Sequence, residues 1–89
     1  MEDVLFKSEE PKSRGDVAAF LRRLADKVEA GEVILRQGDQ EQQVQIPLNL
    51  VLETKLERET KRNGEKMSLE VELEWRSGGC STRGGVELA

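Results

Sequence analysis

The sequence predicts an α+β domain in which one amphipathic helix packs on one face of an antiparallel, mostly meander β-sheet of four to five strands. Apolar residues recur every three or four positions over residues 17–28, which is typical of a helix with one apolar stripe. Between residues 32 and 75 the period becomes two, which is typical of strands with one apolar face. The helix stripe and the sheet face can bury each other when the helix lies across the sheet.

The first expected element is a short strand over residues 4–10. Val4 and Phe6 would lie on one face of it, because side chains alternate along a strand. Pro11 would end this strand.

A helix is expected over residues 14–30. Ser13 is a good N-cap residue, and Asp16 occupies the acidic position of a capping box. Gly31 stands where a left-handed glycine commonly ends a helix. The apolar stripe consists of Val17, Phe20, Leu21, Leu24, Ala25 and Val28.

Two hairpins are expected after the helix. In the first, a four-residue loop at 38–41 would place Leu35 opposite Val44 and Val33 opposite Ile46. In the second, Asn63 and Gly64 have the sequence preferred for a two-residue type I′ turn. That turn would pair Arg62 with Glu65, Leu56 with Val71, Thr54 with Leu73 and Leu52 with Trp75, all in agreement with the apolar alternation.

Composition limits the chemistry of the chain. It has 89 residues, a formal net charge of -4, no His and one Cys, so His-based catalysis, Cys/His zinc sites and a disulfide framework are excluded. The negative charge disfavours a general nucleic-acid binder. No apolar run approaches the about 20 residues of a membrane span, and no signal-peptide pattern opens the sequence. With a single Cys, we expect a cytoplasmic location and no cofactor.

The expected domain covers residues 1–76, and residues 77–89 form a Gly/Ser-rich tail that we expect to be disordered. Cys80 lies in this tail and is interpreted as a free thiol.

Three segments resemble a known family. They are the helix VAAFLRRLADKVEAGEVIL, the segment LNLVLETKLERE after an Ile-Pro pair, and the strand SLEVELEW, which ends in Trp75. Over residues 4–76 the chain resembles the amphi-Trp domain, a family named for its amphipathic character and its tryptophan. The resemblance implies an α+β domain without established enzymatic activity, suggested to act in sensing or interaction, and only Trp75 maps to a signature position.

The outward face of the last hairpin is the first candidate binding site. The predicted register places Glu53 opposite Glu74, Lys55 opposite Glu72 and Glu57 opposite Glu70. One interpretation is a solvated face that also deters edge-to-edge aggregation. The other is a face that docks a basic partner or a cation. The candidate residues are Glu53, Lys55, Glu70, Glu72 and Glu74.

Two other places are weaker candidates. Trp75 shares the face of Leu73 and is interpreted as a core anchor or as the rim of a pocket. The tip of the last hairpin gathers four basic residues and is interpreted as a solvated turn or a phosphate contact. These residues are Arg58, Lys61, Arg62 and Lys66.

The sequence therefore favours a non-enzymatic interaction, sensor or adaptor module. It would bind a protein by its charged sheet face or by an edge strand, which also makes a homodimer possible. The alternative is a regulatory domain linked to a small molecule or a nucleic acid, using the Trp75 end or the basic tip. Neither function involves a membrane.

Overall fold

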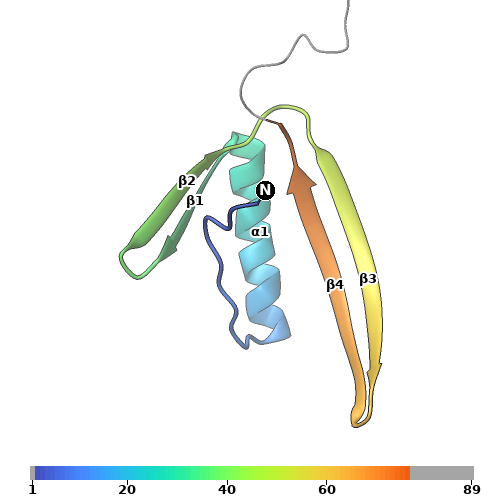
Figure 1. Ribbon diagram of the computed structural model, residues 1–89. Helices are drawn as coiled ribbons and strands as arrows, with labels where there is room; N and C mark the ends of the chain where they lie inside the picture. Colours follow the sequence, from blue (N-terminus) through green and yellow to red (C-terminus); the bar gives the residue numbers. More distant parts are fainter. Residues whose placement is uncertain (1, 77–89) are drawn as a thin grey trace, which may run out of the picture. The chain divides into compact units, whose positions relative to one another are not determined.

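The computed structural model describes residues 2–76 and contains one helix and four strands (Figure 1). The chain divides into two compact units, Met1–Leu48 and Asn49–Ala89. The first unit holds α1 (Arg14–Ala30), β1 (Glu32–Gln37) and β2 (Gln40–Gln45), and the second holds β3 (Val51–Lys61) and β4 (Gly64–Glu74). The tail at 77–89, with Cys80, lies outside the described residues.

Helix α1 begins and ends where the sequence predicts, because both ends are set by local hydrogen bonds. The Asp16 N–H donates to Ser13 Oγ at 3.0 Å, which satisfies one of the free donors of the first turn. Gly31 has a φ of 90°, and its N–H donates to the carbonyl oxygens of Lys27 and Val28, both at 3.0 Å. This left-handed C-cap favours glycine, which has no Cβ to clash.

The predicted strand at residues 4–10 is wrong. The structure contains no strand between residues 2 and 12, and both Val4 and Leu5 are exposed. A strand needs a neighbour to accept and donate ladder hydrogen bonds. No described strand pairs with this segment.

Strands β1 and β2 form a hairpin in a register that differs from the predicted one. The loop contains two residues, Gly38 and Asp39, rather than four, and Gly38 has a φ of 58°. Val33 therefore lies opposite Val44 instead of Ile46, and Leu35 opposite Gln42. The Ile46 N–H donates to the Gly31 carbonyl oxygen at 2.8 Å, which extends the same register toward the helix. The shift is two residues, so each side chain keeps its predicted face.

Strands β3 and β4 are also shifted by two residues relative to the prediction. The loop is Arg62-Asn63, and Lys61 lies opposite Gly64, instead of Arg62 opposite Glu65. A type I′ turn at Asn63-Gly64 needs a positive φ at Asn63. Among residues 2–76 only glycines have a positive φ, so Asn63 does not have the conformation that this turn needs. The residue with a positive φ is Gly64, at 137°, directly after the loop.

The observed register changes the partners on both faces of this hairpin. Leu56 lies opposite Leu69 instead of Val71, Thr54 opposite Val71 instead of Leu73, and Leu52 opposite Leu73 instead of Trp75. The charged residues are corrected too: Glu53 faces Glu72 rather than Glu74, Lys55 faces Glu70 rather than Glu72, and Glu57 faces Ser68 rather than Glu70. The predicted register has two directly opposed pairs of these acids, and the observed register has one. This difference favours the observed register, because like charges opposite each other are destabilising.

The α+β class and the antiparallel hairpins are confirmed. The four strands form two two-stranded sheets, β1-β2 and β3-β4.

Val33, at 8% exposure, is the buried hydrophobic residue of the described chain. The apolar face of β3-β4 carries Leu52, Leu56, Met67, Leu69, Val71 and Leu73, and all but the half-buried Leu73 are 55–73% exposed. Within residues 2–76, the structure has no helix long and apolar enough to cross a bilayer.

Candidate functional site

The charged face of the β3-β4 hairpin brings the predicted candidate residues together. Glu53 and Lys55 project from β3, and Glu70, Glu72 and Glu74 project from β4 on the same side, because side chains alternate along each strand. A shallow depression of about 240 Å³ lies on this hairpin, lined by Glu53, Lys55, Glu70, Val71 and Glu72. We call the five predicted residues the charged face.

Lys55 is the single cation of the charged face. Its Nζ lies 3.5 Å from Glu57 Oε2 on its own strand and 3.7 Å from Glu70 Oε2 across the ladder. The negative charges of Glu57 and then of Glu70 raise the pKa of Lys55. Since all three side chains are more than half exposed, each ion pair contributes little to stability. Lys55 is thus already neutralised by its neighbours.

The acids beside Lys55 form an acid cluster, Glu53, Glu72 and Glu74. One carboxylate oxygen from each lies within 4.8 Å of the others, and all three residues are exposed. A hydrogen bond to Glu74 and the negative charge of Glu74 raise the pKa of Glu72, while a hydrogen bond to Glu53 lowers it to a smaller extent. The spacing suits the oxygen ligands of a hard cation. Exposed acids commonly gather without one, so the spacing alone does not assign a metal site.

The raised pKa of Glu72 predicts a pH dependence of stability. A carboxyl group whose pKa is higher in the folded chain binds its proton more tightly there, so stability falls as pH rises from its ordinary 4.5 through the raised value. At a chain concentration low enough to keep the chain monomeric, we expect Glu72→Gln to be more stable than the wild type above this window and equal to it at lower pH. Urea denaturation followed by circular dichroism between pH 3 and pH 8 measures this. A wild-type advantage at neutral pH would contradict it.

The basic tip is less basic than its composition indicates. Arg58 Nε lies 3.9 Å from Glu65 Oε2, and Lys61 Nζ lies 3.6 Å from Glu59 Oε1. Arg62 lies in the two-residue loop. Lys66 forms no ion pair with any residue in the range 2–76. Two of the four cations are therefore compensated by nearby acids, which weakens a phosphate site here.

Trp75 lies directly after β4 and is half-buried. The alternation of β4 places it on the side of Leu73 and Val71, the apolar face. Leu50, which precedes β3, is half-buried as well. The described pockets do not include Trp75 among their lining residues.

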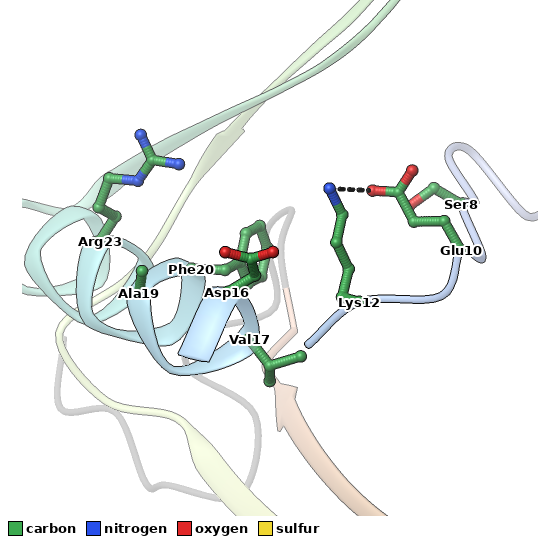
Figure 2. Close-up of a pocket in the computed structure, with 8 residues that line it drawn as sticks. All are labelled: Ser8, Glu10, Lys12, Asp16, Val17, Ala19, Phe20 and Arg23. Carbon is green, nitrogen blue, oxygen red and sulfur yellow. Dashed lines mark ion pairs between the residues drawn. The ribbon is translucent and has the colours of Figure 1, made fainter. Parts of the chain in front are cut away.

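A groove beside the first turns of α1 was not predicted from the sequence. It measures about 570 Å³ and lies between the N-terminal segment and the helix (Figure 2). Glu10 and Lys12 from the segment form an ion pair at 3.5 Å, and Phe20 is a half-exposed ring on the helix side. No sequence pattern indicates this groove, because residues 4–10 were expected to form a strand. Its lining is completed by Ser8, Asp16, Val17, Ala19 and Arg23.

Comparison with known proteins places the chain in a family. The model of the Amphi-Trp domain family matches residues 1–89, a longer span than the 4–76 over which the resemblance was drawn. The chain belongs to the Amphi-Trp domain family. No curated protein and no solved structure matches the chain.

Proposed function

We propose that this Amphi-Trp domain is a non-enzymatic interaction module that binds a basic segment of a protein through its charged face. The observation that carries the proposal is the acid cluster: three exposed carboxylates meet within 4.8 Å although Glu53 and Glu72 repel each other across the ladder. Such an arrangement weakens the free hairpin. A lysine-rich or arginine-rich partner segment would relieve the repulsion by supplying the missing positive charge.

The apolar face of β3-β4 must be buried by another element of the fold if the hairpin is to be stable enough to bind a partner. An isolated two-stranded hairpin is at best marginally stable in water, and stable sheets have more strands or a helix packed on them. We propose that the two hairpins join in one sheet in meander order, through the free edge of β3, and that the α1 stripe covers its apolar face, with residues 1–76 as one domain. The stripe supplies side chains of suitable size, including the exposed Val17, Phe20 and Leu21. The charged face would then be the side that remains open to a partner.

The inventory of the whole chain supports a module without catalysis. The chain has no His, so a nucleophile would need a carboxylate or a Lys as its base. The carboxylates that do come together lie on an open face, whereas acid–base catalysis by paired carboxylates needs a site that excludes water. We further propose a cytoplasmic location, which agrees with the single Cys.

The test is a nuclear magnetic resonance titration of the full chain with a lysine-rich peptide. We expect amide shifts over residues 53–57 and 70–74 and a loss of binding at high salt, because exposed ion pairs are screened. An acidic peptide of the same length should produce none of these shifts. Unmoved amides on both strands in the presence of the basic peptide would refute the proposal.

A pair of matched variants locates the binding site. Removing all three charges of the acid cluster should weaken binding of the lysine-rich peptide about tenfold, since each exposed ion pair is worth about 0.2–1 kcal/mol. The control removes three acids from the first unit and has the same net charge, so it should bind like the wild type. Equal losses in both variants would show that only net charge matters. The cluster variant is Glu53→Gln, Glu72→Gln, Glu74→Gln, and the control is Glu9→Gln, Asp26→Asn, Glu29→Gln.

The alternative function, a regulatory domain at the Trp75 end or the basic tip, has less support. Arg58 and Lys61 each lie within 4 Å of a carboxylate, so the tip presents little free positive charge to a nucleic acid. A homodimer through an edge strand is compatible with the interaction module, because edge pairing uses the backbone groups of the strand and leaves most carboxylates of the charged face open.

A further inference from the structure

Strand β4 has one edge without a partner in the described chain. It pairs with β3 on one side only, over a continuous register of eleven residue pairs. In an antiparallel pair, hydrogen-bonded and non-hydrogen-bonded positions alternate, and the two residues flanking a two-residue loop are a hydrogen-bonded pair. With Lys61 and Gly64 in that position, the odd residues of β4 point their N–H and C=O groups away from β3. They are Glu65, Met67, Leu69, Val71 and Leu73.

This edge has few of the features that usually prevent pairing. Natural edge strands are short, interrupted by proline or a bulge, or covered. Strand β4 has eleven residues, no proline and no break in its register. The charged side chains of β4 are the one feature left that can prevent pairing with another strand. The pattern of these charges therefore decides which strand can pair with the β4 edge.

We infer that the β4 edge pairs with the β4 edge of a second copy of this chain, antiparallel about a two-fold axis at Leu69, so that Glu72 lies opposite the partner's Lys66. This register uses every outward residue of β4: Leu69 meets the partner's Leu69, Val71 the partner's Met67 and Leu73 the partner's Glu65. The result is a closed dimer in which β3-β4-β4-β3 are the central strands of one continuous sheet.

The charges of β4 are complementary to themselves in this register. Glu72 meets the partner's Lys66 twice, once on each side of the axis, and Glu70 meets the partner's Ser68. Lys66 has no ion pair among residues 2–76, so it is free for this contact. Glu72 lies among acids within its own chain, so a cation from the partner would compensate a repulsion that already exists.

The neighbouring possibilities fit less well. Moving the axis to Ser68 would pair Glu70 with the partner's Lys66 but would leave Glu72, a member of the acid cluster, opposite the partner's Gly64 and without a cation. Moving the axis to Glu70 would place that acid opposite the partner's Glu70. Pairing β3 with β3 about Leu56 would place Lys55 opposite the partner's Glu57 but also Glu53 opposite the partner's Glu59, each on both sides of the axis. Like charges directly opposite each other are destabilising. Self-pairing through β4 about Leu69 avoids both conflicts and extends the apolar face across four strands.

Sedimentation of the full chain under reducing conditions tests the dimer. We expect twice the 10.0 kDa of one chain, with a concentration-dependent return to monomer. A monomer mass at chain concentrations up to about 1 mM, which corresponds to about -4 kcal/mol of binding, would overturn the inference.

A charge swap tests the edge. Glu72→Lys places two lysines opposite each other across the axis and should raise the dimer dissociation constant about tenfold. Adding Lys66→Glu reverses both charges and should restore the dimer. The matched control is Glu53→Lys, which makes the same charge change in the acid cluster but on β3. It should leave the dimer intact while weakening binding of the basic peptide, so the inference and the proposed function fail in different ways. Equal effects of Glu72→Lys and Glu53→Lys on the dimer would contradict the β4 edge.

A disulfide tests the register. In a Cys80→Ser chain, Leu69→Cys should oxidise to a covalent dimer, because a hydrogen-bonded antiparallel pair has its Cα atoms about 5.5 Å apart, within disulfide reach. Val71→Cys is the control: the two copies of residue 71 would lie four residues apart, about 13 Å, which is too far. Cross-linking of residue 71 without that of residue 69 would show that the axis is elsewhere.

Discussion

Replacing Leu56 by lysine should destabilise this domain by about 3 kcal/mol, a large part of the about 5–13 kcal/mol expected for a chain of this size. Leu56 lies in the middle of the apolar face of β3-β4, opposite Leu69. If α1 covers this face as proposed, Leu56→Lys removes a buried apolar side chain and buries a charge without a partner. Urea denaturation followed by circular dichroism measures the loss.

The neighbouring position on the other face is the control. Glu57→Lys introduces the same residue one position along β3 and removes the exposed ion pair with Lys55, so it should change stability by less than about 0.5 kcal/mol. Leu56 is 70% exposed in the structure. If that exposure persists in solution, Leu56→Lys would be as mild as Glu57→Lys, and the proposed cover of the apolar face would be wrong.

The bounds of α1 could be predicted from the sequence because they depend on residues close together in the chain. The Ser13 cap and the left-handed Gly31 act within one turn of the helix ends. The expected strand at 4–10 could not be judged in the same way, since a strand exists only when a distant segment supplies its ladder. The sequence shows apolar residues such as Val4 and Phe6 but not whether a neighbour reaches them.

The registers of both hairpins were wrong by two residues for one reason. An alternation with period two determines which face a side chain occupies, and a shift by two leaves every face unchanged. The turn decides between such registers. The first loop has two residues instead of four and begins with Gly38, and the second moves back by one residue to end just before Gly64, where both glycines have a positive φ. The Asn63-Gly64 sequence alone does not determine the register of the second hairpin.

For the candidate site, too, the sequence predicts the face on which each residue lies but not its opposite partner. The alternation correctly placed Glu53, Lys55 and Glu70 on one face with Glu72 and Glu74. The alternation alone brings the three acids near one another, and the register decides only that Glu72 rather than Glu74 lies directly opposite Glu53. The groove beside α1 could not be predicted, because it depends on how an irregular segment lies along the helix.

Trp75 gives the second large effect. We expect Trp75→Ala to destabilise the domain by about 2 kcal/mol, less than the 3–5 kcal/mol of a fully buried aromatic because the ring is half-buried. Trp75→Phe should lose less than half of that, since phenylalanine keeps most of the apolar area. Urea denaturation followed by circular dichroism compares the three proteins.

The chain has one tryptophan, so its emission should be blue-shifted when folded and should move to longer wavelength on unfolding. A Trp75→Ala chain as stable as the wild type, with wild-type emission already at the wavelength of exposed tryptophan, would instead identify Trp75 as a surface ring available to a ligand.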